Sequence, residues 1–243
     1  LLEKSNHKDA SVKRLEPLIL KWKEIIKENP DLEASAFLIF TDKKEYAEIN
    51  SDALLPAASS IKVPILIILL SMLDSGEILW NEKLTLTQEV IGSGSGWMAY
   101  ENIGKKFPIF EVASEMIRVS DNTATNLLIK RIGGIELLNS RLKKLGLKNT
   151  KLNNYLPDLK GTNLTSTKDL SLAMALVDTG YFLNGRSRDI FREIMRTSQT
   201  NSLIPKGILK GLGKDTDDID YSLSLKGYFI YNKTGDIGIS YSD

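Results

Sequence analysis

Residues 59–70 read SSIKVPILIILL, and the interpretation of the whole chain starts from this stretch. Its apolar part, residues 63–70, is far shorter than the about 20 residues that a helix needs to cross a bilayer. Pro64 falls within the first turn or so of a helix that begins near Ser59, where proline is tolerated. The stretch therefore predicts a helix over residues 59–73 that is buried in the core of a globular protein.

A serine and a lysine stand at the start of this helix. Ser59 and Lys62 are three residues apart, so both side chains lie on one helical face. A lysine serves as a base toward a serine hydroxyl when burial or a neighbouring positive charge lowers its pKa. The free N–H groups at a helix N-terminus also favour a developing oxyanion. The pair predicts nucleophilic serine chemistry, but a Ser-x-x-Lys pattern alone is common by chance.

Composition excludes several other chemistries. The 243 residues include no cysteine and one histidine, His7, which lies in a charged N-terminal segment. A Ser-His-Asp or Cys-His site needs an imidazole beside its nucleophile, and the only one lies in this segment. A zinc site needs three or four Cys or His ligands, and the chain supplies one. The net charge of +1, from 32 basic and 31 acidic side chains, gives no basic footprint for nucleic acid. We therefore expect no metal, no cofactor and no nucleic-acid partner.

The order of predicted elements indicates one sheet assembled from both ends of the chain. Apolar spacing predicts a helix over residues 8–27, and a hairpin follows at 34–40 and 46–50. Helices are then predicted at 109–119, 122–132, 135–145, 167–180 and 187–196. Strand character returns only at 226–232 and 237–241. We expect a single domain over residues 1–243, with sheet parts at about 1–55 and 197–243 and a helical part at about 56–196.

Two further tripeptides make the serine chemistry specific. Ser120-Asp121-Asn122 opens a predicted helix, and Lys233-Thr234-Gly235 lies in the final strand region. Each occurs by chance in roughly one such chain in ten, and finding both in this order after Ser-x-x-Lys is much rarer. With the run SDNTATNLLI at residues 120–129, the chain resembles the penicillin-recognising serine enzymes, and within them the class A β-lactamases.

The resemblance implies an α/β (α+β) fold of the β-lactamase/transpeptidase type, with an antiparallel sheet flanked by helices and an inserted all-helical subdomain. It also implies roles in acylation. Ser59 would be the acylated nucleophile, and Lys62 would take part in removing its proton. Ser120 would relay a proton to the leaving nitrogen, and Asn122 would hold the side-chain amide of the substrate.

The final motif would complete the same groove. By resemblance, Lys233 and Thr234 would supply a positive charge and a hydroxyl for the substrate carboxylate. The backbone N–H groups of Ser59 and Asp236 would form the oxyanion hole, and Gly235 would be a further substrate-binding residue. We therefore expect three separate stretches of chain to meet at one groove.

The chain departs from class A β-lactamases where they carry the glutamate that activates the deacylating water. Residues 152–160 read LNNYLPDLK, which puts Leu156 at the glutamate position, and the nearest acid is Asp158. A positioned general base is typically worth about 10²–10⁴ in rate, so its loss predicts acylation followed by slow deacylation. With leucine here, the chain resembles the penicillin-binding protein A group.

We therefore expect an active-site serine hydrolase that forms acyl-enzymes with β-lactams and D-Ala-D-Ala-type peptidoglycan peptides, as a slowly deacylating D-alanyl-D-alanine peptidase-like protein. The alternatives are a class A β-lactamase that uses Asp158 or an unusual water, a non-catalytic penicillin sensor, and an inactive relative. The resemblance further implies a monomer in the periplasm or secreted. Because the family continues past Lys233-Thr234-Gly235, we expect the last strands and the C-terminal helix to be missing.

A glycine-rich stretch is a further candidate for the groove. Residues 92–97 read GSGSGW, a pattern typical of a flexible loop. One interpretation is an ordinary surface loop. The other is a loop that borders the groove and brings Trp97 or Tyr100 against the substrate.

Overall fold

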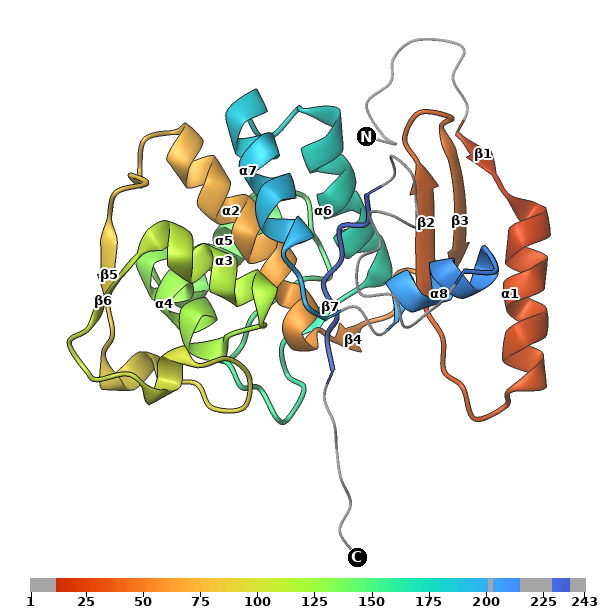
Figure 1. Ribbon diagram of the computed structural model, residues 1–243. Coiled ribbons are helices and arrows are strands. Elements are labelled where there is room, and N and C mark those ends of the chain that lie inside the picture. Colours follow the sequence, from red (N-terminus) through yellow and green to blue (C-terminus); the bar gives the residue numbers. More distant parts are fainter. Residues whose placement is uncertain (1–11, 201–202, 215–228, 237–243) are drawn as a thin grey trace, which may run out of the picture.

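The computed structural model describes residues 12–200, 203–214 and 229–236. Its strands are β1 (Lys13–Arg14), β2 (Ala36–Phe40), β3 (Glu45–Ile49), β4 (Leu55–Pro56), β5 (Lys83–Thr85), β6 (Lys106–Pro108) and β7 (Leu164–Thr165). Its α-helices are α1 (Glu16–Glu28), α2 (Lys62–Asp74), α3 (Ile109–Arg118), α4 (Asn122–Ile132), α5 (Gly134–Lys144), α6 (Thr167–Thr179), α7 (Gly185–Arg196) and α8 (Ile204–Gly211). Its 3-10 helices are η1 (Ala58–Ile61), η2 (Gln88–Val90) and η3 (Met98–Tyr100). Figure 1 shows a small sheet with α1 beside a larger helical part.

The sheet has the strand order β1-β3-β2. β2 and β3 pair antiparallel, which confirms the predicted hairpin. The N-terminal helix is shorter than predicted, because residues 13–14 pair parallel with β3 and α1 begins only at Glu16. Pro17 lies in the first turn of α1, where its missing N–H is not needed, and the N–H of Leu15 bonds to the Tyr46 carbonyl in β3. α1 packs against β3, and α6 packs against β2.

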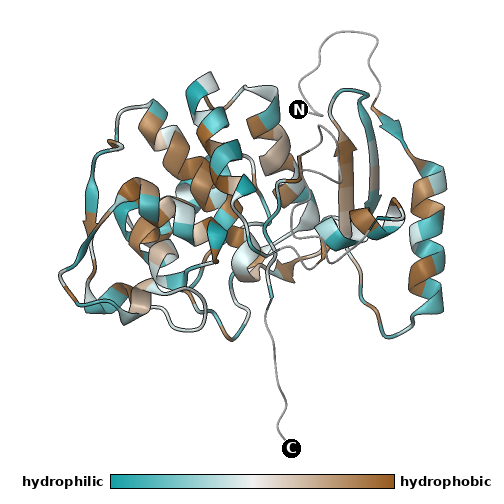
Figure 2. Ribbon diagram, in the orientation of Figure 1, coloured by the Kyte–Doolittle hydropathy of each residue, from teal (hydrophilic) through white to brown (hydrophobic). Residues whose placement is uncertain are grey.

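Helix α2 passes through the centre of the helical part. All of residues 62–70 are buried, and α3 to α7 each contact α2. Figure 2 shows that α2 is strongly hydrophobic. A helix that is apolar on every side needs packing partners all round. The predicted buried helix is thus confirmed, and its N-terminal end lies within the hydrophobic core.

Capping side chains begin three of the remaining helices, α4, α6 and α7. Asp121 caps α4 by accepting a 2.8 Å hydrogen bond from the N–H of Ala124, and Ser166 caps α6 through the N–H of Asp169 at 3.2 Å. Gly180 ends α6 in a left-handed conformation. The predicted helices after residue 100 agree with α3 to α7 to within two residues at each end.

The C-terminal part differs more from the prediction. Helix α8 was not predicted, and the predicted strands at 226–232 and 237–241 lie largely outside the described residues. The described residues 229–236 contain no regular strand. In the described ranges no helix is long and apolar enough to cross a membrane. The predicted division into sheet and helical parts of one domain stays a prediction.

Candidate active site

The candidate nucleophile lies in η1, the tight turn that leads into α2. Ser60 Oγ donates a 2.5 Å hydrogen bond to the carbonyl of Ala57, so this hydroxyl closes the turn. Ser59 Oγ is the other hydroxyl, and it lies 3.1 Å from Lys62 Nζ. Ala58 has a φ of 45°, a left-handed conformation that costs a non-glycine residue on the order of 1–3 kcal/mol. The turn thus presents one of two adjacent serines to the lysine, as the three-residue spacing predicted.

Lys62 is 0% exposed, which is unusual for a lysine. Its Nζ lies near four oxygens, which are Ser59 Oγ (3.1 Å), the Ser120 carbonyl (2.6 Å), Ser120 Oγ (3.0 Å) and Asn122 Oδ1 (2.9 Å). Burial, and then the charge of Lys233, hold the pKa of Lys62 well below its usual range and outweigh the opposite effect of Asp121. None of the four contacts is a carboxylate. The amine is therefore suited to accept a proton from the nucleophile.

Ser120 turns two of its oxygens toward the amine of Lys62. Its φ of 61° is left-handed, and in this conformation its carbonyl and its hydroxyl both contact Nζ. The neighbouring Asp121 is buried and fixes the turn from the other side. Asp121 Oδ2 accepts the backbone N–H groups of Trp97 (2.7 Å) and Met98 (2.9 Å). This support holds a strained serine where it can pass a proton between Lys62 and a bound substrate.

Asn122 is fixed at both ends of its side-chain amide. Its Oδ1 accepts from Lys62 Nζ at 2.9 Å, and its Nδ2 donates to the carbonyl of Ser93 at 2.8 Å. Its backbone N–H donates to the carbonyl of Ser95 at 3.0 Å. The orientation of the amide is therefore set by the lysine on one side and by the Gly/Ser loop on the other.

The Gly/Ser loop at residues 92–97 packs directly against this motif. A Cβ on Gly96 would lie 2.1 Å from Asp121 Oδ2, so a side chain cannot be accommodated there. Gly94 and Gly96 also have positive φ values of 97° and 92°, which glycine adopts without strain. The glycines thus allow the loop backbone to approach the helix-capping aspartate closely.

The two aromatic residues near this loop, Trp97 and Tyr100, have different surroundings. Trp97 Nε1 donates a 2.6 Å hydrogen bond to Glu115 Oε2, and the indole packs edge-on against Phe107. Tyr100, in η3, is 84% exposed. Trp97 is thus an internal anchor of the loop, which argues against the interpretation that it contacts substrate.

The third motif reaches the site from the C-terminal part. Thr234 Oγ1 donates a 2.6 Å hydrogen bond to the Thr200 carbonyl, and the N–H of Thr234 donates to Thr200 Oγ1 at 3.3 Å. Gly235 lies so close to η1 that a Cβ there would be 2.9 Å from the Ser60 nitrogen and 3.1 Å from the Ala57 carbonyl. The backbone after Thr234 therefore runs directly beside the nucleophile turn.

Lys233 brings a second amine to the site. Its Nζ donates a 2.6 Å hydrogen bond to the carbonyl of Thr234, and burial lowers its pKa to about 8. Its charge acts on Lys62, so the two amines share one electrostatic environment. Asp236 follows Gly235 as an exposed residue. The structure thus brings together the three stretches that the sequence predicted to meet.

Leu156 lies next to α4, the helix that carries Asn122. It is 5% exposed and belongs to the main hydrophobic core. Asn126 holds its backbone from both sides: Asn126 Oδ1 accepts the N–H of Leu156 at 2.9 Å, and Nδ2 donates to its carbonyl at 2.7 Å. A Cβ on Gly92 would lie 2.5 Å from the Leu156 carbonyl and 3.0 Å from Asn122 Cβ. The backbone of Leu156 therefore lies close to the Gly/Ser loop and to α4, while its apolar side chain belongs to the core.

Asp158 is turned into its own loop. Its Oδ1 accepts a hydrogen bond from Thr162 Oγ1 at 3.0 Å, and its Oδ2 accepts one from the N–H of Asn163 at 2.5 Å. The N–H of Ala57, beside the nucleophile turn, donates to the Asn163 carbonyl at 2.7 Å. The carboxylate thus closes the loop that supports the nucleophile turn, and both of its oxygens are used there.

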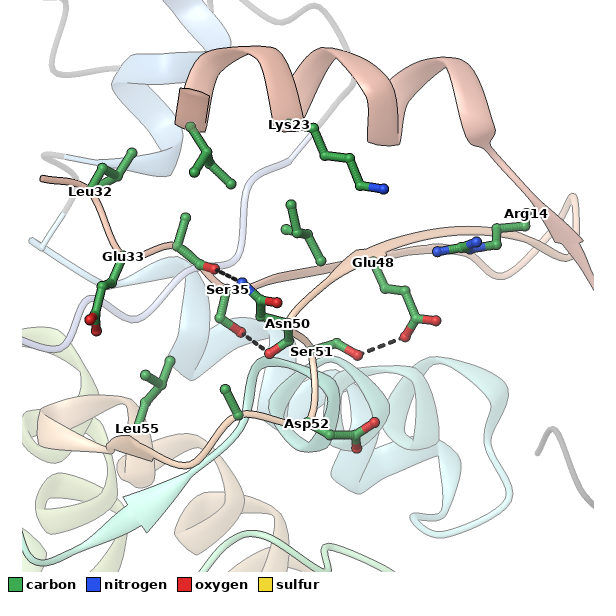
Figure 3. A pocket seen from close by; sticks show the side chains of 14 residues that line it. Arg14, Lys23, Leu32, Glu33, Ser35, Glu48, Asn50, Ser51, Asp52 and Leu55 are labelled. Atoms are coloured by element: carbon green, nitrogen blue, oxygen red, sulfur yellow. Dashed lines mark hydrogen bonds between the residues drawn. The ribbon is translucent and has the colours of Figure 1, made fainter. Parts of the chain in front are cut away.

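A separate pocket of about 860 Å³ lies between α1 and the end of β3 (Figure 3). Charged side chains such as Arg14, Lys23 and Glu48 line it, together with Asn50 and Asp52, and none of the motif residues does. Within the described residues no cluster of three or more His, Asp and Glu side chains could hold a metal ion. We therefore assign the chemistry to the converging motifs.

A sequence model of the beta-lactamase enzyme family matches residues 17–243. The chain belongs to this family. It is 26% identical to a beta-lactamase of Bacillus licheniformis over 193 residues, which are 76% of this chain and 62% of that protein. It is 27% identical to beta-lactamase 3 of Bacillus cereus over 138 residues, which are 54% of this chain and 43% of that protein. The chain thus spans less than two thirds of the length of these curated relatives.

Solved structures of PBP-A are similar over nearly the whole chain. PBP-A is 36% identical, with a TM-score of 0.84 over 96% of this chain and 82% of that one. A leucine-to-glutamate mutant of PBP-A, in an acyl-enzyme complex with penicillin G, is 36% identical with a TM-score of 0.85, over 95% and 81%. These likenesses confirm the predicted β-lactamase/transpeptidase-like α+β fold and the predicted resemblance to class A enzymes and PBP-A. The chain thus combines the family's sequence pattern with the fold of PBP-A.

Sequence reasoning did not single out several supporting residues. Asn126 lies one helical turn after Asn122, a spacing that indicates a shared helix face. Thr200 has no such local signal, because its partner Thr234 is 34 residues away. Glu115 has none either, because its partner Trp97 is 18 residues away in a loop.

Proposed function

We propose that this protein forms an acyl-enzyme with D-Ala-D-Ala-type peptides of peptidoglycan, is acylated by β-lactams, and deacylates slowly. One observation carries the proposal: the buried amine of Lys62 lies 3.1 Å from Ser59 Oγ. Slow deacylation rests on the buried Leu156, which stands where the resemblance to class A enzymes places their deacylating glutamate. Peptidoglycan peptides are met outside the cytoplasm, so the proposal includes a periplasmic or secreted location. The groups required come from one chain, which fits a monomer.

Acylation begins with proton transfer. Lys62 Nζ, in its neutral form, takes the proton of Ser59 Oγ as that oxygen attacks the carbonyl carbon of the substrate amide. The backbone N–H groups of Ser59 and Asp236 stabilise the oxyanion that forms. The C–N bond then breaks, and Ser120 Oγ gives its proton to the leaving nitrogen and regains one from Lys62. The serine proton thus ends on the leaving amine, and no other reactant is needed.

Recognition of the substrate falls to the other two motifs. Lys233 supplies a positive charge and Thr234 a hydroxyl for the carboxylate that β-lactams and D-Ala-D-Ala peptides share. Asn122, fixed between Lys62 and the loop, holds the side-chain amide of the substrate. Because burial lowers the pKa of Lys233 to about 8, the proposal includes weaker carboxylate binding above that pH.

Slow deacylation follows from the loop that contains Leu156. Hydrolysis of the acyl-enzyme needs a water that a base activates, and a buried leucine supplies none. Asp158 is the nearest acid in the sequence, but both of its oxygens accept hydrogen bonds from Thr162 and Asn163. A positioned base is typically worth about 10²–10⁴ in rate, which is the expected size of the defect in hydrolysis.

The test is to mix the protein with penicillin G and to follow both intact mass and released product. We expect one equivalent of stable adduct, and no adduct in Ser59→Ala, with Ser71→Ala in α2, whose hydroxyl bonds only to the Ile68 carbonyl, as the matched control that is still acylated. Rapid multiple turnover would instead support the second candidate, a β-lactamase, which the names of the curated relatives favour. No adduct at all would contradict both.

A further inference from the structure

A buried carboxylate outside the three motifs lies close to the Gly/Ser loop. Glu115, in α3, is 8% exposed, and its Oε2 accepts a 2.6 Å hydrogen bond from Trp97 Nε1. Arg118 approaches the same carboxylate in bidentate fashion, with both hydrogen bonds at 2.7 Å. Burying a charge is costly unless it is paired and hydrogen-bonded, and here both oxygens are satisfied. Such a fully bonded carboxylate holds the indole in one place.

The surroundings of the indole are also defined. Its ring packs edge-on against Phe107 with 5.8 Å between centroids, and the ammonium of Lys105 lies 6.0 Å from its centroid. Burial raises the pKa of Glu115, but the hydrogen bonds from Arg118 and Trp97 more than offset this, so its pKa lies below the usual value. The carboxylate therefore stays charged at neutral pH, and an indole N–H bonded to it is a strong contact.

Apart from the indole of Trp97, hydrogen bonds to backbone groups hold the loop, and side-chain packing contributes little. Ser93 and Gly94 are exposed, and the glycines contribute no side-chain packing. One end of the loop is fixed at Gly92, whose N–H donates to Thr123 Oγ1 at 2.9 Å. The other end is fixed at Trp97, by its backbone N–H and by its indole. Between these two anchors lie the carbonyls that orient Asn122.

The last turn of α3 contacts the other motifs through its backbone. The Glu115 carbonyl accepts the N–H of Asp121 at 3.1 Å, and the Arg118 carbonyl accepts the N–H of Gln199 at 2.9 Å. Gln199 precedes Thr200, which binds Thr234. One helical turn therefore supports the loop, the second motif and the approach to the third.

We propose that the Glu115–Arg118 pair is a positioning element for the acylation site, which acts by anchoring Trp97 and thereby fixes the loop carbonyls that orient Asn122 beside Lys62. The inference rests on the proposed acylation of Ser59. It assigns to Glu115 and Trp97 no contact with the substrate. Its consequence is that the hydrogen bond between Trp97 and Glu115, outside the three motifs, controls the orientation of the Asn122 amide.

The first experiment compares Trp97→Phe with Trp80→Phe. Trp97→Phe keeps an aromatic ring and removes only the indole donor, and Trp80 is a matched control because it also packs edge-on against a phenylalanine, Phe110. We expect the second-order rate constant for acylation by penicillin G to fall by about tenfold in Trp97→Phe, since small misplacements cost up to about 10²-fold. The control should acylate normally. An unchanged rate in Trp97→Phe would overturn the proposal.

The second experiment uses Glu115→Gln, with Glu82→Gln as the control, because Glu82 also binds an arginine, Arg131, in bidentate fashion. We expect a similar loss of acylation, and no further loss in the double variant with Trp97→Phe, because both act through one contact. If the losses of acylation rate in the two single variants add up in the double variant, Glu115 and Trp97 do not act through one contact. A purely structural role would lower the melting temperature of Glu115→Gln and Glu82→Gln alike and leave acylation of both unchanged.

Hydrogen exchange separates this inference from the proposed function. In Glu115→Gln the N–H of Asn122, which donates to Ser95, should exchange about tenfold faster, because local opening becomes easier. This readout needs no substrate. Faster exchange in a protein that penicillin never acylates would contradict the proposed function and leave the anchor supported, whereas unchanged exchange with normal acylation would overturn the anchor alone.

Discussion

Two sides of one site are built in opposite ways. On one side, Lys62 is buried among four oxygens, and every group near its amine can donate, accept or pass a proton. On the other side, Leu156 contributes an apolar side chain to the core, and Asp158 is turned into its own loop. In the proposed function, the first side supports acylation of the serine, and the second side lacks a base for hydrolysis of the acyl group.

Under the proposed function, this contrast teaches that acylation and deacylation have separate structural supports. The acylation side depends on strained turns at Ala58 and Ser120 and on a fully buried amine. The deacylation side depends on one side chain at position 156, whose backbone Asn126 holds. Each side is therefore open to a separate test.

The largest effect should come from removing the amine on the acylation side. Lys62→Met keeps the volume of the side chain and removes the base, so acylation by penicillin G should fall by about 10²–10⁴-fold. Stopped-flow measurement of adduct formation checks this, with the exposed Lys130→Met as a control that should be unaffected. Normal acylation in Lys62→Met would show that another group removes the serine proton.

The next effect should come from supplying a base on the opposite side. Leu156→Glu should speed loss of the acyl group by about 10²-fold, at the lower end of what a general base contributes. The control is Leu156→Gln, because glutamine has the size of glutamate but supplies no base. This variant should deacylate as slowly as the original protein. Release of penicilloate after acylation gives the rates. Equal rates in the two variants would mean that the loop, and not one residue, sets the defect.

A smaller effect is expected from pH. Because burial lowers the pKa of Lys62, acylation should rise as pH increases through that lowered value and then level off. Lys233 is protonated below its pKa of about 8, so binding of a carboxylate should weaken as pH rises above about 8. Lys233→Arg should move this alkaline limb to higher pH, because arginine stays charged. If the alkaline fall in carboxylate binding stays at the same pH in Lys233→Arg, the ammonium of Lys233 does not bind the carboxylate.

The smallest effect should come from Asp158. Asp158→Asn weakens the bonds that close the loop, which is worth about 1 kcal/mol and should lower the melting temperature by about 2–4 °C. Deacylation should not change. Thermal unfolding and penicilloate release check the two parts, with the exposed Asp189→Asn as a control. Slower deacylation in Asp158→Asn would show that this carboxylate acts as a base after all.

Much of the helical fold was predictable because its signals are local. The ends of α4 and α6 follow from Asp121 and Ser166 at their starts and from glycines at their ends. The exception at the N-terminus is instructive, since residues 13–14 belong to an apolar helical pattern but pair with β3. Backbone pairing with a distant strand overrides local periodicity.

The site was predictable in its parts and not in its connections. The spacing of Ser59 and Lys62 predicted their contact, because it depends on one turn of chain. The direction in which Asp158 points was not predictable, because an irregular loop has no periodicity to fix it. The bond between Trp97 and Glu115 joins a loop to a helix, and only the folded chain brings the two together.

The two hydrogen bonds between the Asn126 side chain and the Leu156 backbone have a consequence for how such sites evolve. Asn126 bonds only to main-chain atoms, which every amino acid except proline offers in full. The side chain at position 156 is therefore free to change without loss of the contact that shapes the loop. Under the proposed function, a lineage with this scaffold can therefore move between retaining and releasing the acyl group without new architecture, by selection on a single codon.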